Sequence, residues 1–143
     1  MAGPSVVDAS LALKWVLIEP FTPEARTLLA RWQRDGTDIT VPPLYAYEVA
    51  NAIHRKGIEG SIPAADVDGT IDALLGAVVF HPLIPAMARR GVEIAAQTTR
   101  PAAYDSQYVA LAESLGCEMW TADERFWNAV RADFPFVRWI GAR

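Results

Sequence analysis

The chain has 143 residues, the size of one compact domain, and neither a repeat nor a linker divides it. Hydrophobic residues make up 52% of it, which excludes a disordered chain, and its single cysteine excludes a secreted module held together by internal disulfides. The formal net charge of −4 argues against a dedicated nucleic-acid scaffold, which would be basic. Because no apolar run is long enough to cross a membrane and the N-terminus lacks a signal-peptide pattern, we expect one cytoplasmic domain over residues 1–143, without membrane association.

Short apolar runs alternate with segments of helical period along the chain. The run that ends at Asp8 predicts a buried strand, and we expect the run 78–80 to be buried in the same way. The hydroxyl of Thr22 before Pro23 predicts a helix with Thr22 as its N-cap. In chain order, the predicted elements are a strand over 5–8, a helix over 22–35, a strand over 39–41, helices over 44–58 and 63–75, a strand over 78–80, helices over 85–98 and 103–115, a strand over 117–120, a further helix, and a strand over 136–140.

These alternating elements predict an α/β fold. Short buried strands separated by helices form parallel sheets that are covered on both faces. The segment 103–115 agrees with this, since Tyr104 and Tyr108 lie one turn apart on an apolar stripe. The sequence from Thr121 to Glu124 matches a capping box and predicts the start of the following helix.

Four acidic residues are expected at the carboxyl edge of this sheet. This is the edge at which open parallel sheets bind their ligands. Asp8 ends the first strand, and Asp123 comes just after the fourth. Asp105 begins the helix that precedes the fourth strand. Glu48 lies one turn into the helix after the second strand, on the same face as Asn51. We therefore expect the four carboxylates to converge.

These acids have two possible explanations. An acid in the first turn of a helix is often only a cap, and this alternative is strongest for Asp105 and Asp123. Asp8 is harder to explain in that way, because it ends an apolar strand without a basic neighbour in the sequence. Crowded carboxylates repel one another unless a cation neutralises them, and oxygen ligands favour Mg²⁺ or Mn²⁺ over zinc. His54 and His81 lie too far apart in the sequence for a local zinc motif.

The four acids lie in four short blocks of sequence. The blocks are Val6-Val7-Asp8-Ala9-Ser10, Tyr47-Glu48-Val49-Ala50-Asn51-Ala52, Tyr104-Asp105-Ser106-Gln107-Tyr108-Val109-Ala110-Leu111-Ala112 and Thr121-Ala122-Asp123-Glu124-Arg125-Phe126. In order and spacing they resemble the signature of PIN domains, most closely that of VapC-type toxins of toxin–antitoxin pairs. The resemblance extends over essentially the whole chain and implies a three-layer α/β/α sandwich around a short, mostly parallel sheet of four or five strands. It says nothing about substrate choice, because the segments 60–77 and 85–100 share only the general character of the family's sequences and none of its motifs.

The resemblance also implies an activity, that of an endoribonuclease dependent on Mg²⁺ or Mn²⁺. It implies a catalytic acidic quartet made of Asp8, Glu48, Asp105 and Asp123. Polar positions that border the quartet in the family correspond to the candidate substrate-binding residues Ser10, Asn51 and Thr121. We expect Asp8, Asp105 and Asp123 to be the metal ligands, directly or through water. Glu48 would orient or deprotonate the attacking water, or hold a second ion.

Cations near the quartet are candidates for binding substrate phosphate. We favour Arg125, because it lies two residues after Asp123. The five tryptophans are expected mostly in the core, whereas Trp127 and its neighbour Phe126 would lean toward the cleft. Other candidate cations lie at 54–56, 89–90 and 100.

Three other classes of protein share parts of this pattern. A phospho-receiver domain has paired acids near its first strand and a lysine after its last, and neither Lys14 nor Lys56 is placed there. A dehalogenase-like phosphatase requires Asp-x-Asp at the first strand, where Ser10 follows Asp8 instead. A non-catalytic module could use the same acids to bind a basic peptide, and it would differ from an enzyme in having no metal-dependent RNA cleavage.

A toxin of this type implies two protein partners. The resemblance implies a homodimer, and apolar residues on early helices and connections predict its interface, namely Trp15, Phe21, Trp32 and Tyr45. The natural inhibitor would be a cognate antitoxin whose basic tail supplies an arginine to the carboxylates.

Overall fold

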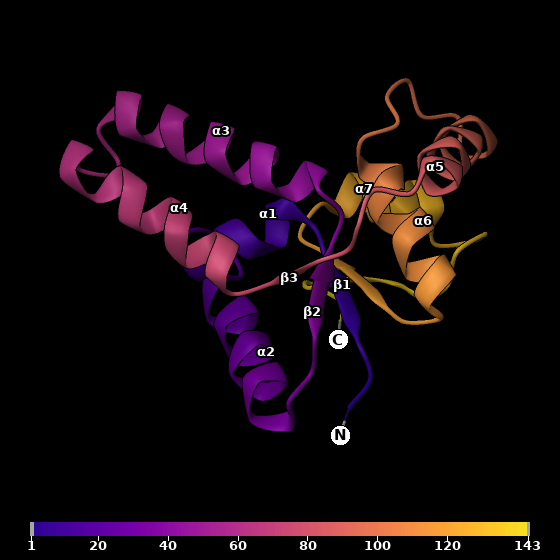
Figure 1. Cartoon of the computed structure of the whole chain (residues 1–143), viewed down its shortest axis with the longest axis horizontal. Coiled ribbons are helices and arrows are strands. Elements are labelled where there is room, and N and C mark those ends of the chain that lie inside the picture. The colour runs from indigo at the N-terminus through magenta and orange to yellow at the C-terminus, as the bar shows by residue number, and fades with distance from the viewer. Residues whose placement is uncertain (1, 143) are drawn as a thin grey trace.

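A computed structural model describes residues 2–142 (Figure 1). Its centre is a five-stranded sheet in which all neighbouring strands of the described chain are parallel. The strands follow the order β3-β2-β1-β4-β5. They are β1 (Ser5–Val7), β2 (Ile39–Val41), β3 (Val79–Phe80), β4 (Met119–Thr121) and β5 (Val137–Trp139). The predicted α/β fold with a short parallel sheet is confirmed.

Helices connect these strands and cover both faces of the sheet, which gives three layers. Because crossovers between parallel strands are right-handed, α2, α3 and α4 lie on one face, and α5, α6 and α7 lie on the other (Figure 1). Within residues 2–142, no helix combines the length and hydrophobicity needed to span a membrane. The helices are α1 (Ala9–Ala12), η1 (Leu13–Trp15), α2 (Thr22–Asp35), α3 (Leu44–Glu59), η2 (Ala64–Asp66), α4 (Val67–Gly76), α5 (Pro85–Gln97), α6 (Asp105–Leu115) and α7 (Glu124–Val130).

The order of the strands reverses between β1 and β4. The chain leaves β1 toward β2 on one side and later returns to β4 on the other side of β1. Val6 pairs with Met119 and Val7 with Trp120, so Asp8 and Thr121 follow at adjacent strand ends. Connections diverge at such a point, which opens a crevice at the carboxyl edge of the sheet.

The core lies on both faces of the central strands. Val6 and Val7 are fully buried and, as neighbours in a strand, point to opposite faces. Of the apolar stripe predicted for α6, Tyr108, Leu111 and Ala112 are buried against this sheet. Tyr104, which precedes the helix, is 65% exposed.

β3 is not the buried strand that its apolar sequence predicts. Val79 is 50% exposed and Phe80 is 41% exposed. β3 is one of the two edge strands of the described sheet and is hydrogen-bonded only to β2, so less of the molecule covers it. A short apolar run does not reveal whether a strand is central or at an edge.

Two predicted helix caps are also wrong. Thr22 is the first residue of α2, and Phe21 occupies the N-cap position in the left-handed conformation at φ 68°. The Thr22 hydroxyl instead donates to the carbonyl oxygen of Leu17 at 2.8 Å and so holds the loop before the helix. Thr121 ends β4, and the N-cap of α7 is Asp123. The sequence pattern predicts that each hydroxyl caps a helix, but both hydroxyls bind partners outside that helix.

The interface predicted on the early helices is mostly core. Phe21 is exposed, but the three other residues are buried, namely Trp15, Trp32 and Tyr45. Phe126 is also fully buried rather than in a cleft, and Trp127 is half-buried against Trp139. Large aromatic side chains occur both in cores and at interfaces, so their type alone did not separate the two.

Candidate active site

The four predicted acids come from different elements that meet at the carboxyl edge of β1 and β4. Asp8 follows β1 and is the N-cap of α1, and Asp123 follows β4 and is the N-cap of α7. Asp105 begins α6, and Glu48 lies one turn into α3. The charge of Asp105 raises the pKa of both Asp8 and Glu48, and that of Asp123 raises the pKa of Asp105. The fold therefore brings all four acids within electrostatic reach of one another.

Asp8 is held by hydrogen bonds to both of its carboxylate oxygens. Ser10 Oγ donates to Asp8 Oδ1 at 2.7 Å, and the backbone N–H of Leu11 donates to the same oxygen at 3.0 Å. The Thr121 hydroxyl donates to Oδ2 at 2.5 Å. The side chain is 4% exposed, so these bonds replace almost all of its hydration and fix its orientation.

Ser10 and Thr121 also join the two strand ends. Ser10 Oγ accepts from the backbone N–H of Ala122 at 3.1 Å, and Thr121 Oγ1 accepts from that of Asp123 at 3.0 Å. The two hydroxyl oxygens lie 3.3 Å apart. Each hydroxyl thus donates to Asp8 and accepts from the backbone after β4. The sequence predicts that they bind substrate, whereas in the structure they position an acid.

Burial makes Asp8 a weaker acid than an exposed aspartate. Loss of hydration raises the pKa of Asp8 to about 7, although the bonds from Thr121, Ser10 and Leu11 lower it, and the charge of Asp105 adds a smaller increase. Near neutral pH, Asp8 is therefore partly protonated, and a cation that binds the carboxylate competes with that proton.

Glu48 has a partner that sequence reasoning missed. The Tyr108 hydroxyl donates to Glu48 Oε1 at 2.6 Å. Burial raises the pKa of Glu48, the bond from Tyr108 lowers it, and the charge of Asp105 raises it further. Burial and the Glu48 carboxylate raise the pKa of Tyr108, so the phenol remains a donor. The sequence placed Tyr108 in an apolar stripe, but its position three residues after Asp105, on one face of α6, is the signal that locates it at the site.

Arg100 is a cation that lies against the acids. Its Nη2 atom is 3.6 Å from Asp105 Oδ2, and its guanidinium carbon is 5.3 Å from the centre of the Phe126 ring. Burial raises the pKa of Asp105, and the Arg100 charge lowers it. The backbone supports this placement, since Thr99 is left-handed at φ 56° and the Arg100 N–H donates to the carbonyl oxygen of Ala95 at 2.7 Å. From the sequence, Arg100 is one of several candidate cations for substrate phosphate, and nothing in the sequence favours it over the others.

Across residues 2–142, the side chains of two predicted site residues make no contact with this cluster. Arg125 is exposed, and so is Asn51, on the turn of α3 after Glu48. In the described part of the chain, neither side chain makes a hydrogen bond or an ion pair. Arg90, from another predicted basic segment, is engaged by Glu113, whose Oε1 atom lies 2.8 Å from its Nε.

The donor chemistry of the cluster suits a hard divalent cation. The four acids offer carboxylate oxygens, and burial and mutual repulsion raise the pKa of Asp8, Glu48 and Asp105, so a divalent cation would stabilise their ionised forms. Within residues 2–142, no three His, Cys, Asp or Glu side chains are grouped closely enough to hold a metal ion. Mg²⁺ usually keeps several of its waters and binds through one or two carboxylates, so the cluster would hold it partly through water.

Comparison with known proteins identifies the class. The PIN domain family model matches residues 5–131, so the chain belongs to the PIN domain family. Two relatives, a VapC ribonuclease of Mycobacterium bovis and ribonuclease VapC9 of Mycobacterium tuberculosis, are each 33% identical to it over 132 residues, which is 92% of this chain and 95% of each relative. Within the family, the chain therefore groups with the VapC ribonucleases. This membership excludes the phospho-receiver and dehalogenase-like alternatives.

Two solved structures share the fold. The crystal structure of PAE2754 from Pyrobaculum aerophilum has a TM-score of 0.68 and 21% identity, and the match covers 90% of this chain and 87% of that one. VapBC-1 from nontypeable Haemophilus influenzae has a TM-score of 0.65 and 10% identity, and the match covers 97% of this chain and 99% of that one. Both likenesses concern the fold.

Replacing Asp8 by Asn should stabilise the metal-free protein at high pH. Between about pH 4 and pH 7, folded Asp8 keeps a proton that unfolded Asp8 has released, so the free energy of unfolding of the wild type falls as the pH rises through this range. Asparagine is uncharged, and its side-chain oxygen can still accept a hydrogen bond from the backbone N–H of Leu11. We expect Asp8→Asn to gain roughly 2 to 4 kcal/mol at pH 8 and little at pH 4 in urea unfolding. An equal gain at both pH values would contradict the assignment.

Proposed function

We propose that this chain is a cytoplasmic, Mg²⁺- or Mn²⁺-dependent endoribonuclease that acts as the toxin of a toxin–antitoxin module. The observation that carries the proposal is the convergence of Asp8, Glu48, Asp105 and Asp123 where the connections after β1 and β4 diverge. Membership of the VapC ribonucleases supplies the substrate class. Crowded carboxylates with unbalanced charge are what metal-dependent hydrolysis of a phosphodiester requires.

A bound divalent ion would lower the pKa of a water molecule and neutralise charge on the phosphate oxygens. Asp8, Asp105 and Asp123 would hold that ion through carboxylate oxygens. Glu48 would orient the attacking water and accept its proton, a role that suits a carboxylate whose pKa is raised by burial. Tyr108 binds one oxygen of Glu48 and so fixes the direction in which the carboxylate faces the water.

Cleavage of single-stranded RNA should require Mg²⁺ or Mn²⁺, leave 5′-phosphate and 3′-hydroxyl ends, and stop in EDTA without rescue by zinc. Asp105→Asn and Asp123→Asn should each lower kcat/KM by about 100-fold or more, because each removes charge that holds the ion. Asp133→Asn, a change of an exposed acid after α7, is the matched control and should have no effect. Product analysis on gels measures this. Full activity in EDTA would refute the metal mechanism, and absence of any cleavage would favour the non-catalytic module.

For substrate phosphate, we propose Arg100 in place of Arg125. The guanidinium lies beside Asp105 and rests on the buried Phe126 ring, so its position is restricted while part of it stays exposed. It competes with a divalent ion for Asp105. Once released from that carboxylate, it can bind a phosphate through two parallel N–H donors without leaving the ring.

Arg100→Met should therefore have opposite effects on two ligands. Removal of the competing cation should raise the affinity for Mn²⁺ several-fold, as measured by calorimetry without RNA. Loss of the phosphate contact should raise KM for RNA about tenfold, since a charge-assisted hydrogen bond contributes roughly 1.5 to 3 kcal/mol. Arg125→Met should change neither quantity. A larger rise in KM for Arg125→Met than for Arg100→Met would restore the original choice of Arg125.

We also propose a homodimer, through a different surface from the one predicted. A groove of about 560 Å³ is lined by proline, leucine and tyrosine side chains that include Leu83 and Tyr104. Leu83 is 74% exposed and Tyr104 is 65% exposed. Tyr104 precedes Asp105, and the exposed Tyr47 precedes Glu48. An interface between copies at this apolar surface would bring two acid clusters together.

Light scattering of the purified protein should therefore give about twice the 15.7 kDa mass of one chain. Leu83→Asp should give the mass of a monomer, because it buries an unpaired charge in the interface. Ile18→Asp replaces an apolar residue that is even more exposed but lies outside the groove, and it should remain a dimer. A monomeric wild type would contradict the proposal.

The proposed inhibitor is an antitoxin whose basic tail places an arginine among the acids. The contact between Arg100 and Asp105 supports this, because it is an arginine–carboxylate pair of the same kind within the chain. Expression of the chain alone should arrest growth of the host, and co-expression with the antitoxin encoded beside it should restore growth. Equal growth in both cultures would leave the antitoxin without support.

A further inference from the structure

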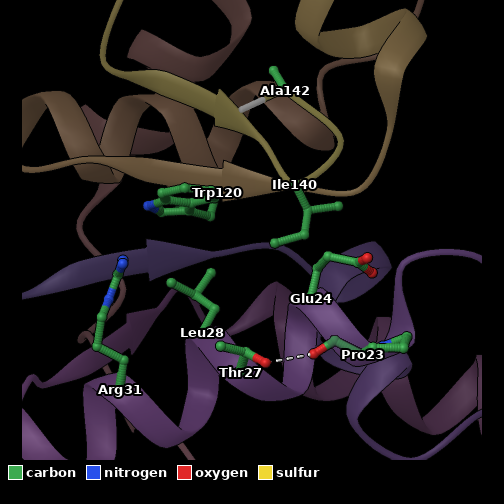
Figure 2. Close-up of a pocket in the computed structure, with 8 residues that line it drawn as sticks. All are labelled: Pro23, Glu24, Thr27, Leu28, Arg31, Trp120, Ile140 and Ala142. Atoms are coloured by element: carbon green, nitrogen blue, oxygen red, sulfur yellow. Dashed lines mark hydrogen bonds between the residues drawn. The ribbon is translucent and has the colours of Figure 1, made fainter.

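Two adjoining pockets lie along β4 and β5. The first, of about 440 Å³, lies between α2 and the sheet, where Trp120 and Ile140 are opposite Leu28 and Arg31 (Figure 2). The second, of about 660 Å³, continues along the edge strand β5 to α7. The pockets share Arg31, Trp120 and Ala142, and none of the four acids lines either of them. Both have the volume of ordinary ligand sites.

One face of α7 leads from the acids to the second pocket. Asp123, Trp127 and Arg131 follow one another at intervals of four residues, so they lie on the same face. The Arg131 guanidinium lies 4.3 Å above the Trp127 ring, and this ring lies 5.4 Å from that of Trp139 at an angle of 32°. Trp139 is the register partner of Thr121, which binds Asp8. A stack of two rings and a guanidinium thus begins beside the proposed catalytic cluster.

The second pocket is basic although the chain is acidic. It is lined by Arg31, Arg131 and Arg138, in a chain whose formal net charge is −4. Glu118 also lines it, and Arg138 Nε binds that carboxylate at 2.8 Å. The remaining two arginines leave a positive balance beside three tryptophans. Positive charge interleaved with aromatic rings suits a polyanion that carries flat rings, which describes single-stranded nucleic acid better than an acidic protein segment.

We propose that the two pockets bind single-stranded RNA on one side of the cleaved bond. A base stacks on the outer face of the Arg131 guanidinium, extending the stack of Trp127 and Trp139, and Arg31 binds a phosphate of the same strand. The inference deepens the proposed nuclease function and rests on it. It assigns part of the affinity for RNA to a surface that contains no metal ligand.

The test is RNA binding by the full-length protein in EDTA, where cleavage is suppressed. The probe is a fluorescein-labelled 12-nucleotide RNA. Arg131→Ala and Arg31→Ala should each weaken its binding about 5- to 20-fold. Each should also reduce the slope of log affinity against log salt concentration by about one, the value for one phosphate contact. Arg131→Lys should keep the salt dependence but lose affinity, because lysine has no flat group to stack. Arg34→Ala, which removes an exposed arginine of α2 that lines neither pocket, is the control and should bind as the wild type does.

With Mg²⁺, Arg131→Ala should lower kcat/KM for long RNA and leave that for a dinucleotide unchanged, which also shows that the variant is folded. Wild-type affinity for RNA in both alanine variants would overturn the inference even if the wild type cleaves RNA. An effect of these variants on antitoxin binding alone would assign the pockets to a protein partner and also overturn it. Binding that depends on Arg131 in a protein that cleaves no RNA would sustain this site and refute the nuclease proposal.

Discussion

The buried carboxylate of Asp8 is the constraint on which the arrangement of the site depends. An acid at the end of an apolar strand loses most of its hydration, which is why its pKa rises to about 7. The protein offsets part of this cost with two hydroxyls and one backbone N–H. Ser10 follows Asp8 by two residues, and Thr121 reaches it because β1 and β4 are neighbours whose ends lie in register. The order of the strands thus determines where the acid can be accommodated.

Two of the acids combine a structural role with the functional role proposed for them. Asp8 and Asp123 are both N-caps, and each accepts a backbone N–H three residues further on. Each therefore contributes to the start of a helix while its charge faces the cluster. The cap explanation and the catalytic explanation, which the sequence presented as alternatives, are compatible, since a carboxylate oxygen can accept one N–H and still bind another ligand.

The periodicity of the sequence predicted the strands, the helices and the positions of the four acids along them, because burial imposes that pattern locally. It did not predict what depends on contacts between distant segments. β3 reads as buried but is exposed at a sheet edge, and Thr121 reads as a helix cap but binds Asp8. Tyr108 reads as a core residue, and its hydroxyl reaches Glu48, 60 positions away in the chain. Arg125 is nearer to Asp123 in sequence, yet Arg100 is the arginine beside the acids.

The most direct test of this account is the proton balance of metal binding. Mn²⁺ should be titrated into the full-length protein by calorimetry, in buffers of different ionisation enthalpy. At pH 6, binding should release about one proton, because Asp8 must ionise to accept the metal, and the release should vanish at pH 8.5 and in Asp8→Asn. Binding without proton release at pH 6, or no binding of Mn²⁺ at any pH, would contradict the central role given to Asp8.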